Sequence, residues 1–202
     1  LAFKYRNPVV ILSDGIIGQM MEKVELHPAK PRMTDEERLK AAPWATTGKP
    51  ASRERNVITS LSLDADIQEA FNRKLKNKYD IIRENEVKYS EYLTDDAEYL
   101  FVAFGCSSRI CEAVVDELRA QGIKAGLLRP ITLFPFPSEE IGRLAGQVRS
   151  IMSIELNLGQ MVDDVRLASG GACPVGFYGR QGGNIYTPEE IVEQFKQFNN
   201  MK

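Results

Sequence analysis

The feature that most constrains the fold is a regular alternation of strand and helix patterns after residue 97. Short apolar runs without polar alternation are typical of strands buried on both faces of a parallel sheet. Each run is followed by a segment whose apolar residues recur every three or four positions, as in an amphipathic helix. This order predicts an α/β domain with an open, mostly parallel sheet and helices on both faces. The predicted strands are 99–104, 123–128, 150–156 and 174–178.

Capping residues mark the expected starts and ends of these helices. A serine or threonine before a periodic segment predicts a helix start, because its hydroxyl accepts hydrogen bonds from the first amides. Pro188 and Glu190 strengthen the last start, and Gly122 is expected to close the first helix. The expected caps are Ser107 or Ser108, Ser138 and Thr187.

The first 60 residues lack this alternation. Residues 9–12 are β-branched and apolar, which predicts a buried strand that stops at the Ser-Asp-Gly turn of residues 13–15. Between residues 16 and 26 the pattern favours neither helix nor strand. Residues 27–60 are interrupted by prolines and charges and are predicted to be irregular, with Trp44 anchoring them to this chain or to a partner.

Residues 61–93 carry apolar side chains at helical spacing and are predicted to form one long helix, capped by Asp64 or Asp66. The helix connects the irregular segment to the α/β domain. The chain therefore divides into residues 1–26, 27–96 and 97–202.

Composition excludes several classes of function. A net charge of −2 and a pI near 5.6 argue against a nucleic-acid binder, and no apolar run approaches the length of a membrane span. A single histidine, His27, excludes mechanisms that need two imidazoles. The three cysteines fit neither a zinc ribbon nor a four-thiolate cluster and read as reduced core residues of a cytoplasmic protein. The first residue is Leu1, so we expect a fragment or a processed product.

Ligands of open parallel sheets bind beyond the carboxyl ends of the strands, which selects five places in this chain. Each has a structural alternative. Small residues with a cation at 105–109 could hold an anion, or could simply make a tight turn with a serine cap. The glycines of 179–184 could approach a phosphate, or make a flexible connection. Asp14 could be a catalytic carboxylate, although an Asp-Gly pair is more often a turn. The turn at residues 157–160 leads from a predicted strand into a predicted helix.

The segment 129–137 is a stiff apolar projection with three prolines. Exposed apolar surface of this kind usually marks an interface. Arg129 at its start could bind an anion or pair with a carboxylate. Neither a Walker A motif nor a dinucleotide-binding glycine motif occurs. Without a family resemblance, the residues predict an α/β domain with an extended arm, but they do not indicate an activity.

Four segments together resemble a known family. They are Pro8-Val-Val-Ile-Leu-Ser-Asp-Gly-Ile-Ile-Gly-Gln-Met20, Arg129-Pro-Ile-Thr-Leu-Phe-Pro-Phe-Pro137, Glu155-Leu-Asn-Leu-Gly-Gln-Met161, and Phe177-Tyr-Gly-Arg180 leading into Thr187-Pro-Glu-Glu-Ile191. The chain resembles the alpha subunit of the 2-oxoacid:ferredoxin oxidoreductases, in particular the 2-ketoisovalerate type. The resemblance extends in order over nearly the whole chain. It implies that residues 1–26 are the end of a thiamine-diphosphate pyrimidine domain and residues 97–202 a complete domain like the transketolase C-terminal domain.

The family decarboxylates a 2-oxoacid with thiamine diphosphate, magnesium and iron–sulfur clusters, passes the acyl group to coenzyme A and reduces ferredoxin. The resemblance implies that these groups are bound by the intact complex and none by this chain alone. No catalytic residue is carried over, because the family's threonine motif and activating glutamate precede the region matched here. Beta, gamma and ferredoxin-like delta subunits are the implied partners, and a homodimer is a further option.

On this basis the chain is expected to be a structural and assembly portion of an enzyme subunit, inactive alone. The alternative is a stand-alone α/β module that binds a small anion; a transketolase-type enzyme is disfavoured because the match is to ferredoxin-linked sequences. The residues expected at an interface or at the rim of an active site are Asp14, Gly15, Gln19, Arg109, Arg129, Phe134, Phe136, Asn157, Gln160 and Arg180.

Overall fold

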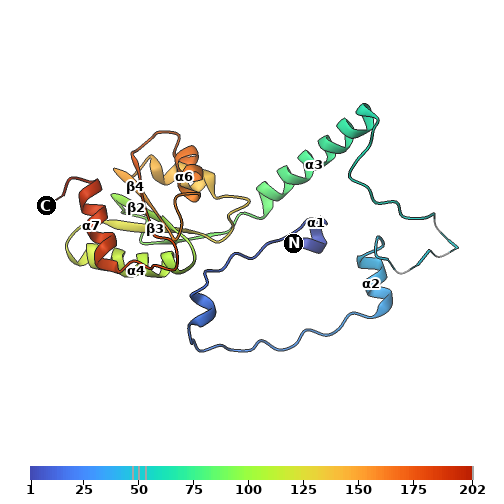
Figure 1. Cartoon of the computed structure of the whole chain (residues 1–202), viewed down its shortest axis with the longest axis horizontal. Helices are drawn as coiled ribbons and strands as arrows, with labels where there is room; N and C mark the ends of the chain where they lie inside the picture. The colour runs from blue at the N-terminus through green and yellow to red at the C-terminus, as the bar shows by residue number, and fades with distance from the viewer. Residues whose placement is uncertain (47, 50, 53, 202) are drawn as a thin grey trace. The chain divides into compact units, whose positions relative to one another are not determined.

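The structure is a computed structural model of the chain that describes residues 1–201 except 47, 50 and 53 (Figure 1). The chain separates into two compact units. The sheet unit consists of Ser13–Met20 and Asp80–Lys202, and the N-terminal unit of Leu1–Leu12 and Met21–Tyr79. The division does not follow the chain in a single cut, because a short early segment belongs to the later unit.

The sheet unit is built around a five-stranded sheet in the order β1-β3-β2-β4-β5. The four strands β2 to β5 are parallel, and β1 pairs antiparallel with β3 at one edge. Phe101 at the centre of β2 lies opposite Leu127 of β3 and Met152 of β4. The strands are β1 Tyr89–Tyr92, β2 Tyr99–Ala103, β3 Ala125–Pro130, β4 Ser150–Glu155 and β5 Val175–Gly179.

Helices cover both faces of the sheet, as the strand and helix order predicts (Figure 1). α4 (Gly105–Ala120) and α7 (Pro188–Phe198) pack with Phe101 and Leu127 on one face. α5 (Ser138–Ala145) and α6 (Met161–Ser169) pack on the other. The α/β fold with a mostly parallel sheet is confirmed.

The cysteines belong to this core as small apolar residues. Cys106, Cys111 and Cys173 are all free and buried. Burial raises the pKa of each thiol, and of Cys111 furthest because it has no exposed surface. Among the described residues, no three His, Cys, Asp or Glu side chains are grouped to hold a metal ion, and no helix there is long and apolar enough to cross a membrane.

The N-terminal unit contains α1 (Ala2–Tyr5), α2 (Asp35–Ala41) and most of α3 (Ala65–Asn85). None of its described residues is buried. Trp44 packs against Phe3 with ring centroids 6.0 Å apart, and the Arg6 guanidinium lies 4.8 Å from its ring. The tryptophan thus anchors the irregular segment to residues of its own chain.

Three element predictions in the N-terminal half are wrong. Residues 27–60 are predicted to be irregular, but Asp35–Ala41 forms helix α2, because Thr34 and Glu37 make a capping box at its start. Residues 9–12 form no strand, because no neighbouring strand pairs with them, and Ile11 is 90% exposed. The predicted helix over 61–93 ends at Asn85, and Tyr89–Tyr92 is strand β1 instead. Pairing with the edge of β3 outweighs the helical spacing there. The short helix η1 (Ile17–Gln19) occupies part of the undecided stretch.

The predicted caps have mixed outcomes. Asp64 caps α3, accepting hydrogen bonds from the amides of Asp66 and Ile67 at 3.0 Å each. Thr187 caps α7 in a full capping box with Glu190. Ser107, Ser108 and Ser138 are not caps. α4 already begins at Gly105, before the first two serines, and α5 begins at Ser138 itself.

Candidate functional site

The carboxyl edge of the parallel strands is the candidate site. After β2 the chain forms β3 on one side and then crosses to β4 on the other side of β2. In open α/β sheets this reversal leaves a crevice at the carboxyl ends of the two strands, where ligands bind. Here β2 leads into α4 and β4 leads toward α6, so the first turns of both helices face this edge.

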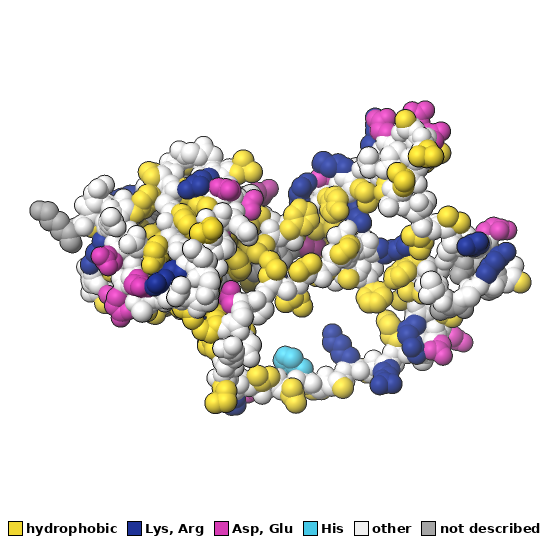
Figure 2. Space-filling view, in the orientation of Figure 1, with side chains coloured by type: hydrophobic (Ala, Val, Ile, Leu, Met, Phe, Trp, Pro, Cys, Tyr) yellow, Lys and Arg dark blue, Asp and Glu magenta, His cyan; other side chains and the backbone are white. Residues whose placement is uncertain are grey.

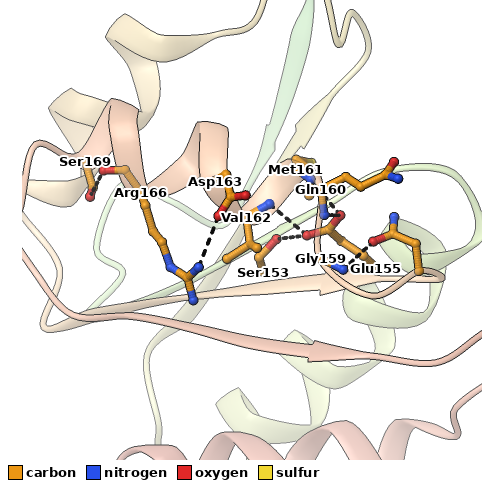
Figure 3. A network of polar contacts seen from close by, with 10 residues as sticks. Ser153, Glu155, Gly159, Gln160, Met161, Val162, Asp163, Arg166 and Ser169 are labelled. Carbon is orange, nitrogen blue, oxygen red and sulfur yellow. Dashed lines mark hydrogen bonds and ion pairs between the residues drawn. The ribbon is translucent and has the colours of Figure 1, made fainter.

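Glu155 at the end of β4 is the most completely bound polar side chain at this edge. It is 1% exposed. Its carboxylate accepts hydrogen bonds from the amides of Met161 and Val162 at 2.8 Å, from the amide of Gln160 at 3.2 Å, and from the Ser153 hydroxyl at 3.0 Å (Figure 3). Residue 160, at the start of α6, supplies no side-chain cap of its own. Glu155 therefore caps α6 from the preceding strand.

Asp14 has the same role at the start of α4. Its carboxylate accepts a hydrogen bond from the amide of Cys106 at 2.8 Å, across 92 residues of sequence. Gly105, the first residue of the helix, has a φ of +60°, and a Cβ on it would lie 2.5 Å from the Asp14 carboxylate. A side chain in that position would displace the carboxylate. Asp14 also begins the turn expected from the Asp-Gly pair, since its carbonyl accepts a hydrogen bond from the amide of Ile17.

Arg180, just after β5, pairs with Glu190 of α7: its Nη1 donates to both carboxylate oxygens, at 2.6 and 2.9 Å. The amide of Thr187 and the Arg180 guanidinium hold the pKa of the Glu190 carboxyl below its ordinary value. Both residues line a shallow depression on the surface. Its other lining residues are Tyr178, Gly179, Gln181 and Asn184.

A buried hydroxyl pair completes the edge. Ser107 in the first turn of α4 and Tyr186 before α7 share a hydrogen bond, and both are buried. Burial raises the pKa of the Tyr186 phenol, so it stays protonated at neutral pH. The pair ties α4 to the segment that precedes α7, and it leaves no nucleophile open to solvent at this point.

The remaining predicted residues lie in different surroundings. Asn157 turns the loop after β4, its side-chain oxygen accepting from the amide of Gly159 at 2.7 Å. Phe134 is 56% exposed beneath the Arg83 guanidinium, while Phe136 packs against the core. Exposed positions are held by Gly15 and Gln19 near η1, by Arg109 on α4 and by Arg129 on β3. For all ten residues that the sequence analysis selected, a position at an interface or at the rim of an active site stays a prediction.

Sequence reasoning missed Glu155 as a functional cap, although it quoted the residue within a motif. The signal that could have found it is an acidic residue at the end of a buried strand followed by a helix with no hydroxyl cap. The start of α4 also has no side-chain cap of its own, but its acceptor Asp14 lies 92 residues away, beyond the reach of such a local signal.

Residues 97–191 match the model of the pyruvate:ferredoxin oxidoreductase core domain II. These residues belong to that family. Over 98% of its length the chain is 46% identical to the ketoisovalerate oxidoreductase subunit VorB of Methanothermobacter marburgensis, of which it covers 54%. It is 32% identical to the 2-oxoglutarate synthase subunit KorA of the same organism, covering 96% of this chain and 57% of the relative.

A similar fold is also seen in a solved structure. A 2-oxoglutarate:ferredoxin oxidoreductase from Magnetococcus marinus, solved with 2-oxoglutarate, coenzyme A and succinyl-CoA bound, superposes with a TM-score of 0.58 at 20% identity. The match covers 67% of this chain and 24% of that one. The family resemblance inferred from the sequence is confirmed. The chain spans about half the length of the curated relatives it matches.

The contacts at residues 105–109 and 179–184 can be compared with the alternative function, a stand-alone module that binds a small anion. An anion at residues 105–109 would need the Cys106 amide, which Asp14 already occupies. An anion at residues 179–184 would need Arg180, which Glu190 holds with two hydrogen bonds. The Cys106 amide and Nη1 of Arg180 thus already have acceptors within the chain, so this alternative gains no support.

Proposed function

We propose that the chain is part of a subunit of a 2-oxoacid:ferredoxin oxidoreductase that acts on branched-chain 2-oxoacids. In that reaction a 2-oxoacid and coenzyme A yield an acyl-CoA and carbon dioxide, and two ferredoxins each accept one electron. The observation that carries the proposal is the 46% identity to a ketoisovalerate oxidoreductase subunit over 98% of the chain. The identity to 2-oxoglutarate synthase subunits is lower, at 32%.

The described residues do not fit an iron–sulfur cluster. No group of three His, Cys, Asp or Glu side chains that could hold a metal ion occurs among them, and a cluster needs four such ligands. The three thiols are buried, separate parts of the core. We propose that thiamine diphosphate, magnesium and the iron–sulfur clusters are held by other parts of the complex, and we derive no step through them.

The role proposed for this chain is assembly. Its N-terminal unit buries none of its described residues yet exposes many large apolar ones, among them Ile11, Met21 and Leu63 (Figure 2). Apolar surface on this scale needs a covering surface. We assign that cover to the rest of the subunit and to beta, gamma and delta subunits, with a second copy of the chain as a further partner, all in the cytoplasm.

The proposal is tested by adding the chain to the other subunits of the complex and measuring co-elution, acyl-CoA formation and ferredoxin reduction. The chain alone is expected to be inactive and to bind neither thiamine diphosphate nor coenzyme A. Submillimolar binding of either by calorimetry would contradict the assembly role. If the chain co-elutes with none of the other subunits, the proposed partners are wrong.

A pair of variants separates interface from fold. Ile11→Asp places a charge on an apolar residue that is 90% exposed in this chain, and it should weaken co-elution without lowering the melting temperature of the chain. Leu167→Asp on α6, which is 82% exposed, is the matched control for a charge on the sheet unit. Equal loss of assembly with both variants would contradict a specific role for the N-terminal unit.

A further inference from the structure

Asp14 lies in a short segment that belongs to the sheet unit, while the chain before and after that segment does not. Ser13–Met20 is part of the sheet unit, whereas Leu1–Leu12 and Met21–Tyr79 form the N-terminal unit. The chain thus passes from one unit to the other three times, after Leu12, after Met20 and after Tyr79. The first two of these crossings exist only while Ser13–Met20 stays bound to the sheet unit. If the segment is released, the chain crosses between the units once, within α3.

The polar contacts of this segment with the rest of the sheet unit concentrate on one carboxylate. Oδ2 of Asp14 accepts from the Cys106 amide at 2.8 Å. The Ser13 hydroxyl reaches only the neighbouring carbonyl of Asp14, at 3.5 Å. Of the apolar residues of the segment, Ile16 is half-buried, whereas Ile17 and Met20 are 42% and 45% exposed. The carboxylate is therefore the principal polar attachment of the segment.

The position of that carboxylate is shaped by the domain. α4 has no side-chain cap of its own, so its first amides need an acceptor from elsewhere. Gly105 has no Cβ, which leaves the space that the Asp14 carboxylate fills. A carboxylate at a helix start is also favoured by the partial positive charge of the aligned amides. Three independent features of α4 thus accommodate one side chain from a distant segment.

We propose that Asp14 is an intramolecular latch: its carboxylate occupies the crevice at the end of β2, caps α4, and holds Ser13–Met20 on the sheet unit. Release of the latch would expose the first turn of α4 and free the segment as one event. The crevice where a sheet of this kind would bind a ligand is, in this chain, used to bind the chain itself.

The test is amide hydrogen exchange on the full chain, with Asp14→Ala, Asp14→Asn and Ser13→Ala. Asp14→Ala should raise exchange in the first turn of α4 by about fivefold or more, together with exchange across residues 13–20. Asp14→Asn should lie closer to the parent, because asparagine keeps an acceptor oxygen and caps helices well. Ser13→Ala is the matched control and should change neither. Amides of β2 and β4 report global opening and serve as the reference.

Thiol labelling gives a second, independent measurement. Cys106 is 6% exposed, and burial together with the Asp14 carboxylate raises the pKa of its thiol. In Asp14→Ala, iodoacetamide should modify Cys106 several times faster, while Cys111, which has no exposed surface, keeps its rate. Unchanged labelling and unchanged exchange at α4 in Asp14→Ala would overturn the latch. Faster exchange at α4 with no change across residues 13–20 would overturn the joint release.

Discussion

The two units of this chain use similar residues with opposite results. Leu118 in the sheet unit has no exposed surface, whereas Leu63 in the N-terminal unit is 98% exposed. Both units contain a helix with a full capping box, Thr34 with Glu37 in α2 and Thr187 with Glu190 in α7. α7 buries Ile191 and Phe195, and α2 buries nothing. Capping residues start helices in both units. Only in the sheet unit do the apolar side chains of the helix pack against other elements of the same unit.

The largest difference should come from truncating the same apolar residue in each unit. Leu118→Ala is expected to lower the free energy of unfolding of the sheet unit by about 2–5 kcal/mol, because it leaves a cavity between α4 and the sheet. Leu63→Ala should change it by less than about 0.5 kcal/mol, because it removes no buried contact. Urea denaturation followed by far-UV circular dichroism measures both. A large effect of Leu63→Ala would mean that the N-terminal unit has a core of its own.

The next largest effect concerns the buried cap at the end of β4. Glu155→Ala removes the acceptor of three helix amides and one hydroxyl, and should cost about 3 kcal/mol or more. Asp163→Ala, in the exposed first turn of α6, is the control and should cost about 0.5 kcal/mol or less. Comparable losses in the two variants would contradict the role of Glu155 as the cap of α6.

The capping boxes give a smaller and more direct comparison. Thr187→Ala should lower the stability of the sheet unit by about 1 kcal/mol, because α7 is packed and its first turn loses an acceptor. Thr34→Ala removes the equivalent bond from α2, which buries no residue, so only local helix content should fall. Residue-level hydrogen exchange separates the two cases. A global loss from Thr34→Ala would show that α2 is coupled to the sheet.

The sequence was most informative where local and long-range forces agree. The strand runs 99–104, 150–156 and 174–178 and the start of α7 are found within a residue or two, because burial on both faces leaves a continuous apolar pattern. Strand β1 was missed because Tyr89 and Tyr92 also fit a helical stripe, and only the free edge of β3 decides between the two. The strand expected at residues 9–12 lacks a sheet in this chain.

The location of the candidate site could be predicted from the sequence, but most of the contacts of its residues could not. The carboxyl edge follows from the strand order alone. The cap on α4 does not, because Asp14 is 92 residues from Cys106 and no local pattern links them. The cap on α6 could have been found locally, because Glu155 ends a buried strand six residues before Met161. A resemblance of ordered segments identified the family. Those segments alone could not show that Asp14 binds the Cys106 amide, that Glu155 binds the Met161 amide, or that Glu190 pairs with Arg180.

The smallest expected effect is a pH dependence at the edge of the sheet unit. Hydrogen bonds from the Thr187 amide and Arg180 lower the pKa of Glu190 in the folded chain below its ordinary value of 4.5. The unfolded state therefore binds the proton more tightly, so this contribution to stability is present above pH 4.5 and is lost as the pH falls through the lower folded value. The difference in melting temperature between the parent and Glu190→Gln should accordingly shrink between about pH 5 and pH 3. Glu193→Gln, on the exposed side of the same helix, is the control and should show no such trend. A difference that stays constant with pH would mean that Arg180 stabilises the helix through contacts other than its pairing with the carboxylate.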